Sequence, residues 1–246
     1  MNILVCNDDG INSEGIIALA LMLSRKGHLV MVAAPDGNRS CYAHSITFYR
    51  EVKVGKTQFA EGIIGYSFSG TPADCVKYVV THSGINFDLV CSGINHGSNL
   101  GTALHYSGTV SACFEANILG LKAIAFSCPN YKEGDFESVA EVCGDVLDKY
   151  FSCLDNTFTL NVNVPPIKKG EKVKGIKVAP LGERRYSDDY EFVKEDTFIV
   201  TGDPIPVDNP EDCDVEWFNK NYVSITPVLL DRTAHEIIKK LKESNI

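Results

Sequence analysis

The chain has 246 residues, enough to bury a sizeable core, and its 44% hydrophobic and 22% charged residues are ordinary for a globular protein. The formal net charge is −9 and no basic stripe is present, which argues against binding to a nucleic-acid duplex. No apolar run reaches the roughly 18 residues of a membrane helix, and residues 1–6 lack the basic start of a signal peptide. We therefore expect a cytoplasmic protein with no membrane partner.

Cysteine usage agrees with that expectation. The nine cysteines include no CxxC pair, and most of them lie inside apolar runs. Buried, reduced thiols acting as small hydrophobic residues are therefore predicted. A disulfide framework or a zinc site would need closer spacing.

The first 165 residues alternate between short apolar runs and helical periodicity. Strands are predicted, in chain order, over residues 2–6, 29–34, 87–92, 122–127 and 158–164. Helices are predicted over about Glu14–Lys26, from Pro72, over residues 110–118 and over residues 139–150. This alternation predicts an α/β fold, a Rossmann-like parallel sheet with helices on both faces. Ligands of such sheets bind at the carboxyl ends of the strands.

The pattern changes after residue 165, where prolines and charges become frequent. Short strands are predicted over 176–179 and 197–201, and a last strand over 222–227. Residues 183–220 are predicted to form an exposed β-hairpin arm. A C-terminal amphipathic helix presents Ala234, Ile237, Ile238 and Leu241 on one face. We therefore divide the chain into a catalytic core, 1–165, and a C-terminal extension, 166–246.

The arm is acidic, yet large apolar residues recur within it. They are Phe192, Phe198, Ile199, Val200, Ile205, Val207, Trp217 and Phe218. An isolated exposed hairpin is only marginally stable, so packing against a second copy of the chain would bury these side chains. This predicts a homo-oligomer, and the C-terminal helix is expected to cross over in the same way. The alternative is that the arm folds back on its own core.

Two adjacent carboxylates, Asp8 and Asp9, directly follow the first predicted strand and precede Gly10. Like charges this close raise each other's pKa, and a divalent cation would remove that cost. A turn that caps the following helix is the alternative reading. Ser40 lies in the polar loop 35–40 after the second strand. Its hydroxyl could be a further oxygen ligand of the cation, and the alternative is an ordinary loop serine.

Residues 92–101, SGINHGSNLG, carry the strongest signal. Three glycines at four-residue spacing, interleaved with Asn and Ser, favour a loop whose backbone closely approaches a ligand. Asn95 and Asn99 offer amide oxygens to a metal and amide nitrogens to a phosphate. Residues 106–110 then open a helix, whose free N–H groups attract anions. The alternative for Ser107 and Thr109 is plain N-capping, which is compatible with phosphate binding.

In these residues the chain resembles the survival protein SurE family, which are 5′/3′-nucleotidases. The matching segments span nearly the whole chain and are Ile3–Ile11, Gly15-Ile16, Ala34–Asp36, Asn38–Ser40, Gly70–Val76, Ser92–Asn95 with Gly97, Asn99 and Gly101, Ser107–Val110 and Tyr222–Pro227. There are two departures. Cys41 stands where the family usually has Gly, and Gly37 where a polar or charged residue is common.

The resemblance implies a phosphatase that hydrolyses nucleoside 5′- and 3′-monophosphates with the help of one divalent metal. Asp8, Asp9, Ser40 and Asn95 would bind the metal, and Asn99, Ser107, Gly108 and Thr109 would hold the phosphate. The same resemblance implies a swapped C-terminal helix and a homodimer or homotetramer.

These residues agree with what the chemistry alone suggests. An all-oxygen set of ligands favours Mg²⁺ or Mn²⁺ over zinc. The metal would polarise the phosphoryl oxygen and activate a water, and Asp8 or Asp9 would also orient that water.

Two other functions remain open at this point. One is a phosphotransferase of the haloacid-dehalogenase type, in which an aspartate is phosphorylated. That family separates its two aspartates by one residue, whereas here they are adjacent. The other is a nucleotide-binding module that keeps the phosphate loop and shows no turnover.

Overall fold

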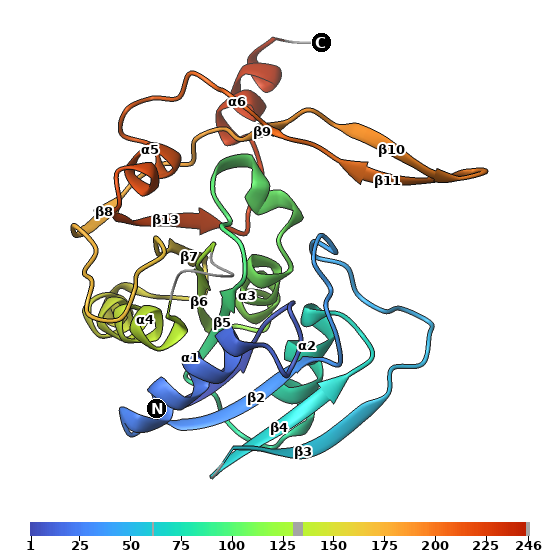
Figure 1. Ribbon diagram of the computed structural model, residues 1–246, viewed down its shortest axis with the longest axis vertical. Helices are drawn as coiled ribbons and strands as arrows, with labels where there is room; N and C mark the ends of the chain where they lie inside the picture. The colour runs from blue at the N-terminus through green and yellow to red at the C-terminus, as the bar shows by residue number, and fades with distance from the viewer. Residues whose placement is uncertain (61, 130–134, 245–246) are drawn as a thin grey trace.

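The computed structural model describes residues 1–60, 62–129 and 135–244. Within them, nine strands form one sheet (Figure 1). Their order is β3 (Val54–Ala60), β4 (Ile63–Phe68), β2 (Leu29–Pro35), β1 (Asn2–Cys6), β5 (Leu89–Asn95), β6 (Lys122–Ser127), β7 (Phe158–Asn163), β13 (Val223–Leu229) and β8 (Ile176–Val178). The central strands β4 to β7 are parallel, while β3 and β13 run antiparallel to β4 and β7.

Helices cover both faces of this sheet, as the sequence predicts (Figure 1). On one face α1 (Glu14–Arg25) packs beside α4 (Phe136–Tyr150), and on the other α2 (Pro72–His82) packs beside α3 (Gly108–Ile118). A hydrophobic cluster of buried residues lies under each pair of helices. The Rossmann-like α/β fold is therefore confirmed. Two short 3₁₀ helices, η1 (Gly101–Tyr106) and η2 (Phe151–Cys153), complete the core.

Strands β3 and β4 were not predicted from the sequence. The first five residues of β3 are exposed, and the strand lies at the edge of the sheet, so it carries no apolar run. Its partner β4 is interrupted by Gly65, whose missing side chain leaves room for Phe59 and Thr57. Neither strand therefore shows the hydrophobic pattern from which the other core strands were predicted.

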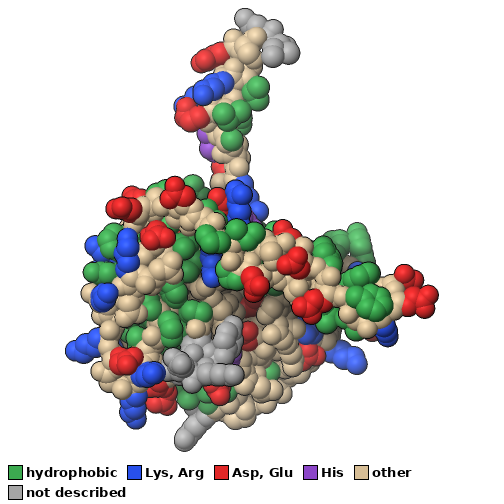
Figure 2. Space-filling model, turned by 45° about the horizontal axis from the view of Figure 1, so that its top comes forward, with side chains coloured by type: hydrophobic (Ala, Val, Ile, Leu, Met, Phe, Trp, Pro, Cys, Tyr) green, Lys and Arg blue, Asp and Glu red, His purple; other side chains and the backbone are tan. Residues whose placement is uncertain are grey.

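The C-terminal extension contains a protruding hairpin of β10 (Asp189–Lys194) and β11 (Thr197–Thr201). The short strands β9 (Arg185–Tyr186) and β12 (Pro204–Ile205) form its base. Helix α6 (His235–Glu243) also projects from the body and buries no residue (Figure 2). The exposed part is narrower than the predicted 183–220, because α5 (Asp214–Asn219) packs against the sheet beside β13.

From here on, the arm means the segment 182–207, in place of the predicted 183–220. Its base is the strand pair β9 and β12.

Along the described chain, no helix combines the length and apolar character needed to cross a bilayer.

Candidate active site

The candidate site lies where β1 and β5 are neighbours in the middle of the sheet. Asp8 and Asp9 follow the end of β1, and Asn95 is the last residue of β5. One pocket of about 390 Å³ lies at this edge and is lined by Asp8, Asp9, Ser40, Cys41, Asn95, His96, Gly97, Ser98, Asn99, Thr102, Ala103, Tyr106, Ser107, Arg184 and Tyr186. The loops after β1, β2 and β5 therefore meet, as expected for the carboxyl edge of a parallel sheet.

The turn after β1 is fixed by Asn7. Its side-chain Nδ2 donates to the Gly10 carbonyl at 3.0 Å and to Ser13 Oγ at 2.7 Å, while its Oδ1 accepts from the Gly10 N–H at 3.2 Å. Gly10 has φ +106°, a conformation that side chains rarely adopt. The tight turn holds the Asp8–Asp9 pair at the end of the strand.

Asp8 is buried, with 3% of its surface exposed. Thr109 Oγ1 donates to its Oδ1 at 2.6 Å. Burial raises the pKa of Asp8 to about 7, and the neighbouring Asp9 charge adds to this effect. Thr109, expected to bind phosphate, thus directs its hydroxyl hydrogen to a carboxylate. The sequence could not show this contact, because the two residues are 101 positions apart.

Asp9 receives the backbone N–H of His96 on Oδ2 at 2.9 Å. Burial raises its pKa, although the His96 N–H opposes the shift. The His96 ring accepts the Gly15 N–H on Nε2 at 3.3 Å and stacks on Phe136 with 4.7 Å between ring centroids. Among the described residues, no lysine or arginine forms an ion pair with Asp8 or Asp9. Asp8 is thus buried and Asp9 half-buried, and the charge of the nearby His96 side chain lowers the pKa of Asp9 against the effect of burial.

The other two predicted ligands come from separate loops. The loop after β2 is tied to the acidic turn, because the Arg39 N–H donates to the Asp8 carbonyl at 2.7 Å. The Ser40 N–H donates to Asn38 Oδ1 at 2.6 Å, and Ser40 itself is exposed at the pocket. Asn95 Nδ2 donates to the Gly97 carbonyl at 2.8 Å, which leaves the amide oxygen of Asn95 for a ligand.

Asn99 is held by side chains that sequence reasoning missed. Its N–H donates to Asn163 Oδ1 at 2.8 Å, and its Nδ2 donates to Ser127 Oγ at 2.9 Å. Its carbonyl accepts from Asn161 Nδ2 at 2.7 Å. Ser127, Asn161 and Asn163 are fully buried on β6 and β7. Polar residues inside two apolar strand patterns were the available signal, because buried polar groups need a partner.

Ser107 caps α3, since its Oγ accepts the Val110 N–H at 3.1 Å. The hydroxyl hydrogen remains available to an anion beside the positive end of the helix. Gly108 has another role. A Cβ there would lie 2.7 Å from Asp8 Cβ, so a glycine is required for Asp8 to reach its position against the helix.

The donors in this pocket fit a hard divalent cation. Two carboxylates, a hydroxyl and an amide oxygen are ligands that Mg²⁺ and Mn²⁺ accept, and a cation would offset the adjacent negative charges of the buried Asp8 and the half-buried Asp9. Within the described residues no group of three or more His, Cys, Asp and Glu could hold a metal. Cys41 and His96 line the pocket, but they belong to no such group, whereas zinc sites typically use three or four protein ligands.

Gly108→Ala is expected to lower kcat by at least tenfold, because the new methyl group forces Asp8 out of place. Gly55→Ala is the matched control. Both glycines have an ordinary φ, and nothing lies within 4 Å of a Cβ at position 55. Phosphate release and the melting temperature should be measured for both variants. Parent-like activity of Gly108→Ala would show that Asp8 tolerates displacement.

Comparisons with known proteins identify the family of the chain. The family model described as survival protein SurE matches residues 3–188. The chain is 41% identical over 249 residues to the 5′-nucleotidase SurE of Petrotoga mobilis, covering 98% of each protein. It is 42% identical over 254 residues to the 5′-nucleotidase SurE of Kosmotoga olearia, covering 99% of this chain and 98% of the relative.

A solved structure shows the same relationship. The SurE protein from Aquifex aeolicus superposes with a TM-score of 0.83 and 35% identity, and the match covers 100% of both chains. Sequence and fold therefore agree over the full length, and the chain belongs to the SurE family.

Proposed function

We propose that this protein is a metal-dependent 5′-nucleotidase that hydrolyses nucleoside 5′-monophosphates, and also 3′-monophosphates, to nucleoside and phosphate. The observation that carries the proposal is the meeting of Asp8, Asp9, Ser40 and Asn95 in one pocket with Asn99 and Ser107. The full-length relatives named 5′-nucleotidase SurE support the same activity.

Asp8, Asp9, Ser40 and Asn95 would hold one divalent cation, Mg²⁺ or Mn²⁺. When bound, the cation supplies Lewis-acid stabilisation of the phosphoryl oxygens and lowers the pKa of water. Thr109 keeps Asp8 in orientation through its 2.6 Å hydrogen bond. The His96 N–H leaves one oxygen of Asp9 for other partners, and Asp8 or Asp9 orients the attacking water.

The phosphate-binding side of the pocket is formed by Asn99 and the start of α3. The Ser107 hydroxyl donates to a phosphate oxygen while it caps the helix, and the Gly108 and Thr109 backbone lies in the first turn, where the helix dipole favours an anion. The two strand asparagines beneath Asn99 hold its backbone in place. No covalent intermediate is required.

The test is phosphate release from a panel of nucleoside 5′- and 3′-monophosphates, with chelator and with each divalent metal. Turnover that depends on Mg²⁺ or Mn²⁺ supports the proposal. Binding without turnover under every metal would instead indicate a non-catalytic nucleotide-binding module. Acid-stable trapping of a phosphoaspartate would indicate haloacid-dehalogenase chemistry.

We also propose that the protein acts as a homodimer or homotetramer, with the core of residues 1–165 carrying catalysis and the extension of 166–246 carrying assembly. Phe192, Phe198 and Val200 on the hairpin are 57–68% exposed. The apolar face of α6 is likewise uncovered (Figure 2). Contacts with a second copy would bury both surfaces.

We also propose a cytoplasmic location. All nine cysteines are free, and reduced thiols are typical of that compartment.

Removing α6 by ending the chain after Leu230 is expected to lower the oligomeric state, since β13 ends at Leu229 and stays intact. Light scattering at micromolar concentration measures the change. The matched control is Lys239→Ala, which alters an exposed ion pair on the same helix and leaves its apolar face unchanged. A full-length protein that is already monomeric would contradict the proposed assembly.

A further inference from the structure

The base of the arm forms one wall of the candidate active site, although it lies more than 80 residues further along the chain. Arg184 and Tyr186 line the same pocket as Asp8 and Asp9. Arg184 Nη1 donates to Ser98 Oγ at 2.6 Å, and the Arg184 guanidinium lies 5.9 Å from the centroid of the Tyr186 ring. A cation and an aromatic ring are therefore presented together to the pocket.

Hydrogen bonds hold this segment against the glycine-rich loop. The Arg184 N–H donates to Thr102 Oγ1 at 3.1 Å, and the Arg184 carbonyl accepts from the same hydroxyl. The fully buried Asp214 accepts the Gly101 N–H at 2.8 Å and the Gly182 N–H at 2.7 Å. One carboxylate thus joins the pocket loop to the start of the arm. Together with the Thr102 contacts, it fixes the position of the Arg184 backbone beside the pocket.

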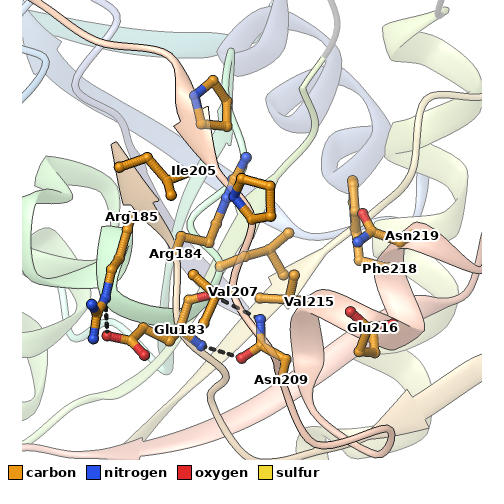
Figure 3. Close-up of a pocket in the computed structure, with 13 residues that line it drawn as sticks. Glu183, Arg184, Arg185, Ile205, Val207, Asn209, Val215, Glu216, Phe218 and Asn219 are labelled. Carbon is orange, nitrogen blue, oxygen red and sulfur yellow. Dashed lines mark hydrogen bonds and ion pairs between the residues drawn. The ribbon is translucent and has the colours of Figure 1, made fainter. Parts of the chain in front are cut away.

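A second cavity of about 330 Å³ lies beside the arm base and is also lined by Arg184 (Figure 3). There Asn209 braces the arm, accepting the Glu183 N–H at 2.7 Å and donating to the Glu183 carbonyl at 2.9 Å. The Arg185 side chain turns to Glu183 Oε1 at 2.6 Å, and Arg184 diverges from it (Figure 3). The two neighbouring arginines therefore have different partners.

The charge of the pocket gives Arg184 a specific role. Of the described residues that line the pocket, Arg184 is the sole lysine or arginine, and Asp8 and Asp9 are the carboxylates in the same lining. A phosphate monoester carries close to two negative charges at neutral pH, and the planar fork of arginine matches phosphate oxygens. The Ser98 contact uses one of the five guanidinium N–H donors, so others can reach a ligand.

Tyr186 is 39% exposed, and its position next to the cation suits a flat aromatic ligand. Bases stack on aromatic side chains with little regard to their identity, because every base presents a π-face. Resting on the nucleotidase function proposed above, we propose that the arm base completes the substrate pocket, with Arg184 binding the phosphate and Tyr186 stacking on the nucleobase.

The experiment compares AMP with ribose 5-phosphate, which keeps the phosphate and sugar and lacks the base. Arg184→Gln should raise KM for both substrates by roughly 10- to 100-fold, and Arg184→Lys should fall between Gln and the parent. Tyr186→Ala should raise KM for AMP by roughly 5- to 50-fold and leave KM for ribose 5-phosphate within about twofold, whereas Tyr186→Phe stays close to the parent.

Further variants keep the test decisive. Ser98→Ala serves as a substitute if Arg184→Gln fails to fold. It removes the hydrogen bond that positions the Arg184 guanidinium and keeps the arginine, so it should raise KM for both substrates severalfold. Tyr106, 66% exposed, also lines the pocket, so Tyr106→Ala is the matched aromatic control. An AMP-specific loss in Tyr106→Ala with none in Tyr186→Ala would overturn the stacking assignment. Values of KM within twofold of the parent for Arg184→Gln would overturn the phosphate assignment.

Calorimetric AMP affinity in the presence of Mn²⁺ gives a readout that does not depend on turnover. A parent that binds AMP and releases no phosphate contradicts the nucleotidase function alone, and the same variants should still weaken binding. A parent that turns over AMP while every arm variant matches it contradicts the role of the arm alone.

Discussion

Asp9→Asn is expected to fold normally and to lose at least about 100-fold in kcat/KM for AMP. Replacing a group that only supports a metal ligand typically costs 10- to 100-fold, so neutralising a ligand itself should cost at least as much. The amide oxygen of the new side chain can still accept the His96 N–H, which now donates to Asp9 Oδ2 at 2.9 Å. Asp8→Asn should show a loss of similar size.

The measurement is steady-state phosphate release across a Mn²⁺ titration. Asp212→Asn, which neutralises an exposed carboxylate outside the pocket, is the control and should match the parent. Near-parent turnover by Asp9→Asn or Asp8→Asn at saturating Mn²⁺ would refute the assignment of these residues.

The second large effect concerns stability without metal. In chelator at pH 8, Asp8→Asn should be more stable than the parent, because the buried Asp8 carboxyl has its pKa raised from 3.8 to about 7. A carboxyl whose pKa is raised by folding costs stability as pH rises, since the folded state then holds the proton more tightly than the unfolded state. The cost is absent below pH 3.8, grows between pH 4 and 7, and is complete above that range.

A rise from 3.8 to about 7 corresponds to about 4 kcal/mol as an upper limit. Thermal unfolding in chelator should therefore show a gap of several degrees at pH 8 that closes towards pH 4. Saturating Mn²⁺ should reverse the order, because a ligand that binds only the folded state stabilises the parent. Equal melting temperatures of Asp8→Asn and the parent at pH 8 in chelator would show that ionised Asp8 does not lower the free energy of unfolding.

The sequence predicted the parts of the fold that repeat an apolar pattern. Residues 2–6 and 87–92 contain enough consecutive apolar residues to define the central strands, and the position of Asp8, Asp9 and Asn95 at their ends followed from parallel topology. The edge strand β3 and its neighbour β4 lacked such a pattern, because β3 is largely exposed and β4 is interrupted by Gly65.

Contacts between segments that are distant in the chain could not be predicted from the sequence. Arg184 reaches Ser98 across 86 positions and Asp214 reaches Gly101 across 113, and no local pattern encodes either contact. The residues that hold Asn99 are polar side chains inside strands, so their role depended on knowing which loop covers them. In the predicted arm, α5 was missed because its buried face is supplied by β13, outside the segment.

The most direct test of the metal site is anomalous diffraction from crystals soaked in MnCl₂ and recorded at the manganese edge. One strong peak is expected within roughly 2.0–2.4 Å of oxygen atoms from Asp8, Asp9, Ser40 and Asn95, the range usual for hard cations. The peak should vanish in Asp9→Asn crystals soaked in the same way. A peak elsewhere in the molecule, or none in the parent at millimolar Mn²⁺, would contradict this account of the site.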